Sequence, residues 1–176
     1  MLIQTALAIS LVVSIVEASA AADAAYTEAT IYTEPHNAAS AAIGTANFIV
    51  GRMARECYAA LGESESFVQS FTKSWQQRNE KYIRAATIYA ANVLSYYERT
   101  KGSQAKEAAL REYVSSVRGQ GAATVEEWLA KGERADVCRR FRSHVEAGSL
   151  DMGPTHPLYK EATELVGIIE AFQGGK

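Results

Sequence analysis

A proline-free stretch of 118 residues between Pro35 and Pro154 is the strongest constraint on the fold of this 176-residue chain. Proline interrupts an α-helix because it lacks a backbone N–H and clashes with the preceding turn. The stretch is rich in Ala, Glu, Gln, Arg and Leu, and its apolar residues recur at spacings of three and four. The sequence therefore predicts an all-α fold, a compact bundle of about five to six helices with one long helix.

The first two predicted helices are bounded by glycine and serine. The first carries an apolar stripe from Ile43 to Leu61 and ends at Gly62 in an expected left-handed cap. The second begins at Ser64 or Ser66, either of which suits an N-cap, and runs to Lys101. It would extend roughly 50 Å if unbroken, because an α-helix rises about 1.5 Å per residue.

The apolar stripe of this second helix is interrupted over Gln76–Lys81. Polar residues occupy nearly two turns there, so that segment has no apolar face to bury. We expect either a kink or an overhang past the neighbouring helices.

Glycines divide the next part of the chain. A third helix is predicted from Ser103 to about Val117, and Gly119–Gly121 is the clearest break in the interior of the sequence. Thr124 and Glu127 have the spacing of a capping box, which predicts a short fourth helix ending at Gly132.

Two more helices complete the predicted bundle. One spans about Glu133–Ala147 and stops at Gly148, and the last begins near Thr155 with Pro157 in its first turn. The inward faces are expected to carry Val137, Cys138, Phe141 and Val145 in the former, and Leu158, Ala162, Leu165, Ile169 and Phe172 in the latter.

The N-terminus has the pattern of a secretory signal peptide. Residues 2–16 form an apolar run too short to span a bilayer comfortably, and Ala18–Ala20 supplies small residues for cleavage after Ala20, with Ala22 and Ala24 as near alternatives. No Lys or Arg precedes the run, which departs from the usual pattern. The competing interpretations are an uncleaved anchor, against which Glu17 argues, and a buried N-terminal helix.

This pattern predicts a signal peptide over residues 1–20, a flexible leader over 21–39 and a single helical domain over 40–176. We therefore expect a periplasmic or secreted protein with no stable membrane span after cleavage.

Cys57 and Cys138 each lie in a predicted core-facing stripe. In an oxidising compartment this arrangement predicts a disulfide, which would close a loop of about 80 residues. Two buried free thiols are the alternative if the chain stays in a reducing compartment, and a catalytic thiol is a third.

The charge balance and the motifs give little sign of a reaction. The net charge is −2, and the chain lacks the clustered Lys and Arg that a nucleic-acid-binding protein needs. No phosphate-binding loop, zinc-protease or hydrolase motif is present, so no cofactor is predicted. We expect a non-enzymatic binding or protein-interaction role, with oligomeric state unspecified.

The alternative role is a small periplasmic enzyme or metal-binding protein. It would use His144, Asp151 and His156, which lie close together in the sequence around a predicted turn. Histidines at helix ends are more often ordinary exposed residues.

Two groups of residues are candidates for binding. The aromatic residues of the second helix suggest a small aromatic or lipidic ligand or a protein partner, or ordinary core packing. The basic fifth helix suggests an anionic or acidic partner, or a solvated face. The candidate residues are Trp75, Tyr82, Tyr89 and Tyr96 in the first group and Arg139, Arg140 and Arg142 in the second.

Overall fold

The computed structural model describes residues 31–174. The chain divides into two compact units, residues 1–33 and 34–176. The predicted signal peptide and most of the predicted leader lie outside the described residues. Of the first unit only residues 31–33 are described, so the fold presented here is that of the second unit, the helical domain.

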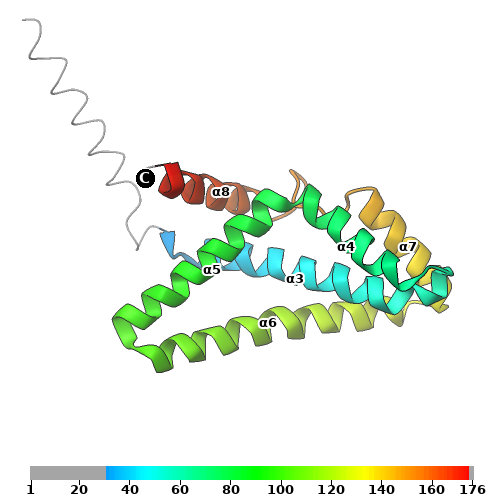
Figure 1. Cartoon of the computed structure of the whole chain (residues 1–176), viewed down its shortest axis with the longest axis horizontal. Coiled ribbons are helices and arrows are strands. Elements are labelled where there is room, and N and C mark those ends of the chain that lie inside the picture. The colour runs from blue at the N-terminus through cyan, green and yellow to red at the C-terminus, as the bar shows by residue number, and fades with distance from the viewer. Residues whose placement is uncertain (1–30, 175–176) are drawn as a thin grey trace, which may run out of the picture. The chain divides into compact units, whose positions relative to one another are not determined.

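The helical domain contains six α-helices and a short 3₁₀-helix within its described residues, which confirms the predicted all-α class. In chain order they are α3 (Glu34–Cys57), η1 (Ala59–Leu61), α4 (Glu65–Arg78), α5 (Glu80–Lys101), α6 (Ser103–Leu129), α7 (Arg134–Glu146) and α8 (Tyr159–Gly174) (Figure 1).

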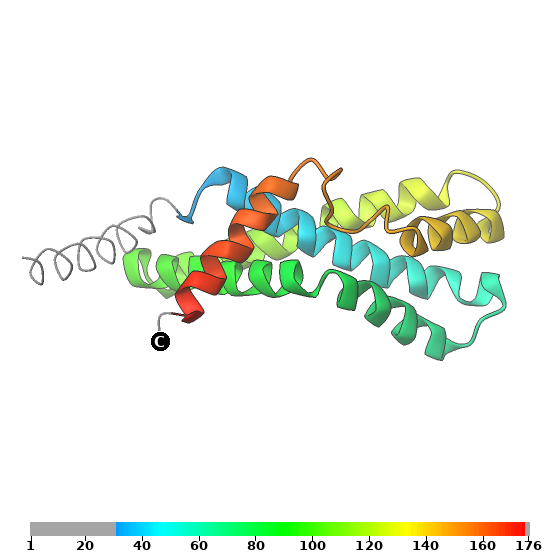
Figure 2. The same cartoon turned by 90° about the horizontal axis from the view of Figure 1, so that it is seen from above.

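Helix α3 is the centre of the domain, because it packs against each of the other five α-helices. Helices α5 and α6 form a hairpin around Gly102 and lie along α3. Figure 2 shows α8 crossing α5 and the N-terminal part of α3, whereas α7 lies beside the C-terminal part of α3.

The start of α3 differs from the sequence prediction. The predicted leader extended to residue 39, but α3 begins at Glu34. Pro35 then lies in the first turn, where its missing N–H costs nothing and its fixed φ favours the helix. Ala39 and Ser40 are buried, so tertiary packing holds this turn in the domain.

The main core cluster lies where α3, α4, α6 and α7 meet. Trp75 and Phe141 are its largest side chains, and both are almost completely buried. Burying a side chain of this size contributes roughly 1.5–3 kcal/mol. The cluster comprises Val50, Met53, Cys57, Trp75, Val125, Val137, Cys138, Phe141 and Val145.

The predicted disulfide is present in this core. Cys57, the last residue of α3, is bonded to Cys138 of α7, and their Cα atoms are 5.3 Å apart. The inward face predicted for α7 is also confirmed, because Val137, Phe141 and Val145 are buried beside the bond.

The second predicted helix is broken at Asn79, inside the stretch where a kink was expected. Helix α4 ends at Arg78 and α5 begins at Glu80. Asn79 is buried, and its side-chain amide donates to the Trp75 carbonyl at 3.0 Å and to Asp151 Oδ1 at 3.1 Å. Its side-chain oxygen accepts from the backbone N–H of Met152 at 2.8 Å. The hydrogen bonds to Asp151 and Met152 therefore attach the junction between α4 and α5 to a distant part of the chain.

The two cap predictions between the first and second predicted helices had different outcomes. Gly62 adopts a left-handed conformation, with φ of 70°, as expected. Ser64 occupies the N-cap position of α4 but makes no capping hydrogen bond from its side chain. Instead, Ser64 Oγ and Ser66 Oγ are 2.7 Å apart.

The predicted break at Gly119–Gly121 and the separate fourth helix are wrong. Helix α6 runs without interruption through both glycines, and Thr124 donates to the carbonyl of Gln120 instead of capping a new helix. Gly121 is buried beneath α3, and a Cβ placed there would lie 2.5 Å from Phe48 Cδ1. Gly121 therefore permits close helix contact, and α6 is the long helix of the domain.

This contact predicts opposite effects for two substitutions in α6. Gly121→Ala is expected to destabilise the domain by about 1–3 kcal/mol because the Phe48 ring must move. Gly119→Ala is the matched control, since a Cβ there meets nothing within 4 Å, and it should stabilise the helix by up to about 1 kcal/mol. Urea unfolding measures both. Equal effects would show that Gly121 has no packing role.

The last helix begins later than expected. Helix α8 starts at Tyr159, and the predicted start near Thr155, with Pro157, belongs to the turns that precede it. Leu165 and Ile169 are buried as predicted, but Phe172 is 48% exposed. None of the described helices combines the length and the hydrophobicity that crossing a bilayer requires.

Candidate functional site

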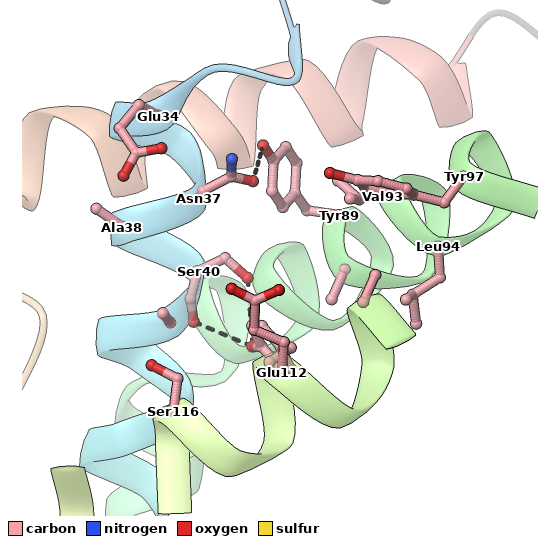
Figure 3. A pocket seen from close by; sticks show the side chains of 14 residues that line it. Glu34, Asn37, Ala38, Ser40, Tyr89, Val93, Leu94, Tyr97, Glu112 and Ser116 are labelled. Carbon is pink, nitrogen blue, oxygen red and sulfur yellow. Dashed lines mark hydrogen bonds between the residues drawn. The ribbon is translucent and has the colours of Figure 1, made fainter. Parts of the chain in front are cut away.

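A groove with a volume of about 430 Å³ lies between α3, α5 and α6 (Figure 3). Two other cavities have volumes of about 10 and 50 Å³, which suffices only for water. We call the larger cavity the α3–α5–α6 groove. Its lining residues are Glu34, Asn37, Ala38, Ser40 and Ala41 of α3, Tyr89, Ala90, Val93, Leu94 and Tyr97 of α5, and Ala109, Glu112, Tyr113 and Ser116 of α6.

Small side chains create the space. Four alanines line the groove, one or two from each helix, namely Ala38, Ala41, Ala90 and Ala109. An alanine reaches only one carbon atom from the backbone, so adjacent helices cannot fill the volume between them at these positions. The groove therefore follows from the choice of small residues on facing helices.

Tyrosine hydroxyls are held by polar groups of α3 at the wall of the groove. Tyr89 is buried and donates to Asn37 Oδ1 at 2.9 Å. The Tyr113 hydroxyl donates to the backbone carbonyl of Ser40 at 3.4 Å, and it lies 3.5 Å from Ser40 Oγ. Ser40 Oγ also lies 3.3 Å from the carbonyl of Ala86, to which it donates. The walls are thus fixed by hydrogen bonds, as a preformed site requires.

The charged groups that line the groove are both acidic. Glu34 lies in the first turn of α3, where the helix dipole favours a negative charge. Glu112 lies in the middle of α6 and is exposed. Among the described lining residues there is no Lys, Arg or His.

The aromatic residues predicted from the second helix divide between core and groove. Trp75 is a core residue whose indole N–H donates to the Leu150 carbonyl at 3.3 Å. Tyr82 is buried and packs edge-on against Tyr159. Of the four predicted residues only Tyr89 lines the groove, where Tyr97 joins it.

Tyr96 lies outside the groove lining. Its ring packs edge-on against that of Tyr97, with ring centroids 6.2 Å apart. It therefore supports the position of a groove residue without lining the cavity itself.

The arginines of α7 are engaged with neighbouring groups. Arg139 is paired with Asp136. Arg142 is paired with Glu63 at 2.9 Å and Glu146 at 2.8 Å, and the hydrogen bonds to Glu146 and Glu63 raise its pKa above the ordinary arginine value.

Arg140 donates to the backbone carbonyl of Lys131 at 3.3 Å. Two of the three predicted arginines thus pair with carboxylates, and the third bonds a carbonyl.

The three residues of the alternative metal site have separate environments. The exposed His144 ring packs edge-on against Trp128, and Asp151 pairs with Arg78 at 2.9 Å. His156 Nδ1 accepts a hydrogen bond from the N–H of Leu158, and burial lowers the pKa of the imidazole. In the described part of the chain, no group of three or more His, Cys, Asp or Glu side chains is arranged to hold a metal ion.

Most groove residues were absent from the sequence candidates. Asn37 lies in the predicted leader, and Tyr97 belongs to the aromatic stripe of the second predicted helix. Glu112 and Tyr113 were not distinguished from other residues of the third predicted helix. An alanine-rich face repeated on three helices was the available signal, but helix pairing decides whether such faces meet.

Comparison with known proteins identifies no relative: no protein-family model, curated protein or solved structure matches the chain.

Proposed function

We propose that this protein is an exported, non-enzymatic binding protein that holds a small ligand with an aromatic or aliphatic body in the α3–α5–α6 groove. The observation that carries the proposal is the groove volume of about 430 Å³. Small-molecule sites in proteins are typically clefts of roughly 300–1,000 Å³, lined by apolar and aromatic side chains with a few fixed polar groups.

The lining of the groove fits this description. Val93 and Leu94 offer apolar contact, and the rings of Tyr89, Tyr97 and Tyr113 offer flat surfaces that carry hydroxyl groups. Hydrogen bonds to α3 fix two of the three tyrosines before any ligand arrives. Such preorganisation reduces the entropy lost on binding.

Export is supported by the buried disulfide between Cys57 and Cys138, because such bonds persist mainly in oxidising compartments. Expression of the full-length chain in a bacterial host tests this part of the proposal. Intact-mass measurement should find a chain starting near Ala21 in the periplasm or medium. Retention of residues 1–20 in a cytosolic product would contradict export.

The binding proposal is tested with the neutral fluorescent probe N-phenyl-1-naphthylamine. We expect saturable fluorescence enhancement with the wild-type protein. Ala90→Leu, which adds three carbon atoms at the groove wall, should weaken binding about tenfold, or about 1.4 kcal/mol. Ala91→Leu is the matched control, because Ala91 is exposed on the same helix and does not line the groove.

Thermal unfolding of both variants shows whether they keep the wild-type fold. Equal probe affinity for Ala90→Leu, Ala91→Leu and the wild type would place the probe elsewhere. A wild-type protein that produces no saturable signal would contradict an apolar binding groove.

A further inference from the structure

We infer that the ligand of the α3–α5–α6 groove is a small organic cation, a protonated amine carried on an apolar body. This inference rests on the proposed function and adds the chemical class of the ligand. It depends on charge complementarity, on the tyrosine rings and on the size of the cavity.

The first argument is the unbalanced charge of the lining. Glu34 and Glu112 are its charged residues, and no ion pair of either carboxylate occurs among the described residues. In Figure 3 the Glu112 carboxylate projects toward the space between α3 and α5. An anionic ligand would meet like charge there, and a ligand amine would supply the missing partner.

The second argument is how Glu112 differs from the other acidic residues of α6. Glu107 pairs with Arg111 at 3.6 Å, Glu126 with Arg52 at 3.6 Å, and Glu127 with Lys131 at 2.7 Å. Glu112 has Ala108 and Ser116 one turn away on either side, so its own helix supplies no cation at the favourable spacing. Within the described residues, Glu112 is the acid of α6 whose charge is left for an external partner.

The third argument is the aromatic surface. Tyr89, Tyr97 and Tyr113 line the groove, and tyrosine rings attract cations through their negative faces. Tyr97 already makes such a contact, because Lys101 Nζ lies 4.6 Å from its ring centroid. An ammonium group is therefore compatible with this aromatic wall.

The fourth argument is the apolar part of the groove lining, which indicates that the ligand carries an apolar body as well as a charged group. Val93, Leu94 and Ala109 provide an apolar surface in the same groove as the carboxylates of Glu34 and Glu112. A bare metal or ammonium ion would leave this surface unused, whereas an amine on an alkyl or aryl body would cover it. The volume of about 430 Å³ accommodates a ligand of this kind.

The test compares three amphiphiles that share an unbranched alkyl chain and differ in the charge of the head group. They are decylammonium, decanol and decanoate, each used below its aggregation threshold. Their affinities are measured by calorimetry and by displacement of N-phenyl-1-naphthylamine. With the wild-type protein we expect decylammonium to bind about five- to tenfold more tightly than decanol, and decanoate to bind most weakly.

Glu112→Gln should bring the affinities of decylammonium and decanol together. The matched control is Glu107→Gln, which makes the same change of charge on the same helix outside the groove. It should retain the preference for the amine. Raising the salt concentration should reduce the preference in the wild type, since salt screens exposed charges.

Each result separates this inference from the proposed function. If the probe binds and Ala90→Leu weakens it, but decylammonium has no advantage over decanol, the groove binds ligands and the cation inference is wrong. Loss of the preference in Glu107→Gln as well would also overturn it, because surface charge in general would then be the cause. Absence of probe and amphiphile binding would instead contradict the proposed function.

Discussion

Replacing both Cys57 and Cys138 with alanine is expected to lower the free energy of unfolding by about 4 kcal/mol. The bond joins residues separated by 81 positions, and closing a loop of this length removes much conformational entropy from the unfolded chain. For a domain of this size the thermal midpoint should fall by roughly 10–15 °C. Scanning calorimetry on oxidised wild type and the double variant measures the difference.

Reduction of the wild type provides the control for this experiment. A reductant removes the cross-link but keeps both sulfur atoms, so it separates the cross-link from the loss of buried side-chain atoms. The reduced wild type should unfold close to the double variant. Identical midpoints for the oxidised and reduced wild type would show that the bond does not stabilise the domain.

Asn79→Ala is expected to cost about 2–3 kcal/mol although Asn79 lies at a helix junction. The substitution removes the acceptor of the buried Met152 N–H and the donor to the Trp75 carbonyl and Asp151. A buried polar group left without its partner costs about 1–3 kcal/mol. Urea unfolding monitored by circular dichroism measures the effect.

Asn92→Ala is the matched control for this prediction. Asn92 is exposed on α5, and surface substitutions of this kind usually change stability by less than about 0.5 kcal/mol. If Asn79→Ala were as stable as Asn92→Ala, the hydrogen bonds at the junction would contribute nothing net to the fold.

The spacing of residues along the chain was sufficient to predict the buried face of α7 and the disulfide. The stripe of Val137, Phe141 and Val145 predicted the buried face of α7 because helical periodicity is a property of neighbouring residues. The two cysteines, each within such a stripe, also predicted the disulfide correctly.

Local patterns failed where a residue serves a contact with a distant helix. Glycine is a residue type that often breaks helices, yet Gly121 lies inside α6 and leaves room for the ring of Phe48 from α3. Asn79, at the junction of α4 and α5, bonds to Asp151 and Met152, which lie more than 70 positions away. Propensity describes the cost of a residue in an isolated helix, and tertiary contacts override it.

The α3–α5–α6 groove could likewise be predicted only in part from the sequence. The tyrosines of α5 were recognisable as binding candidates, but only the groove separates Tyr89 and Tyr97 from the core residues Trp75 and Tyr82. Glu112 differs from the other acidic residues of α6 because those residues form ion pairs, and only the structure shows these pairs.

The pattern of residues along the chain was enough to predict that the described part is helical, which face of α7 is buried and that Cys57 and Cys138 are bonded. The packing of the helices against one another sets where the helices break, which glycine permits a close contact and which small faces combine into a groove. The physical reason is range: helix formation depends on residues within one or two turns, whereas a groove depends on side chains from three helices that meet only after packing.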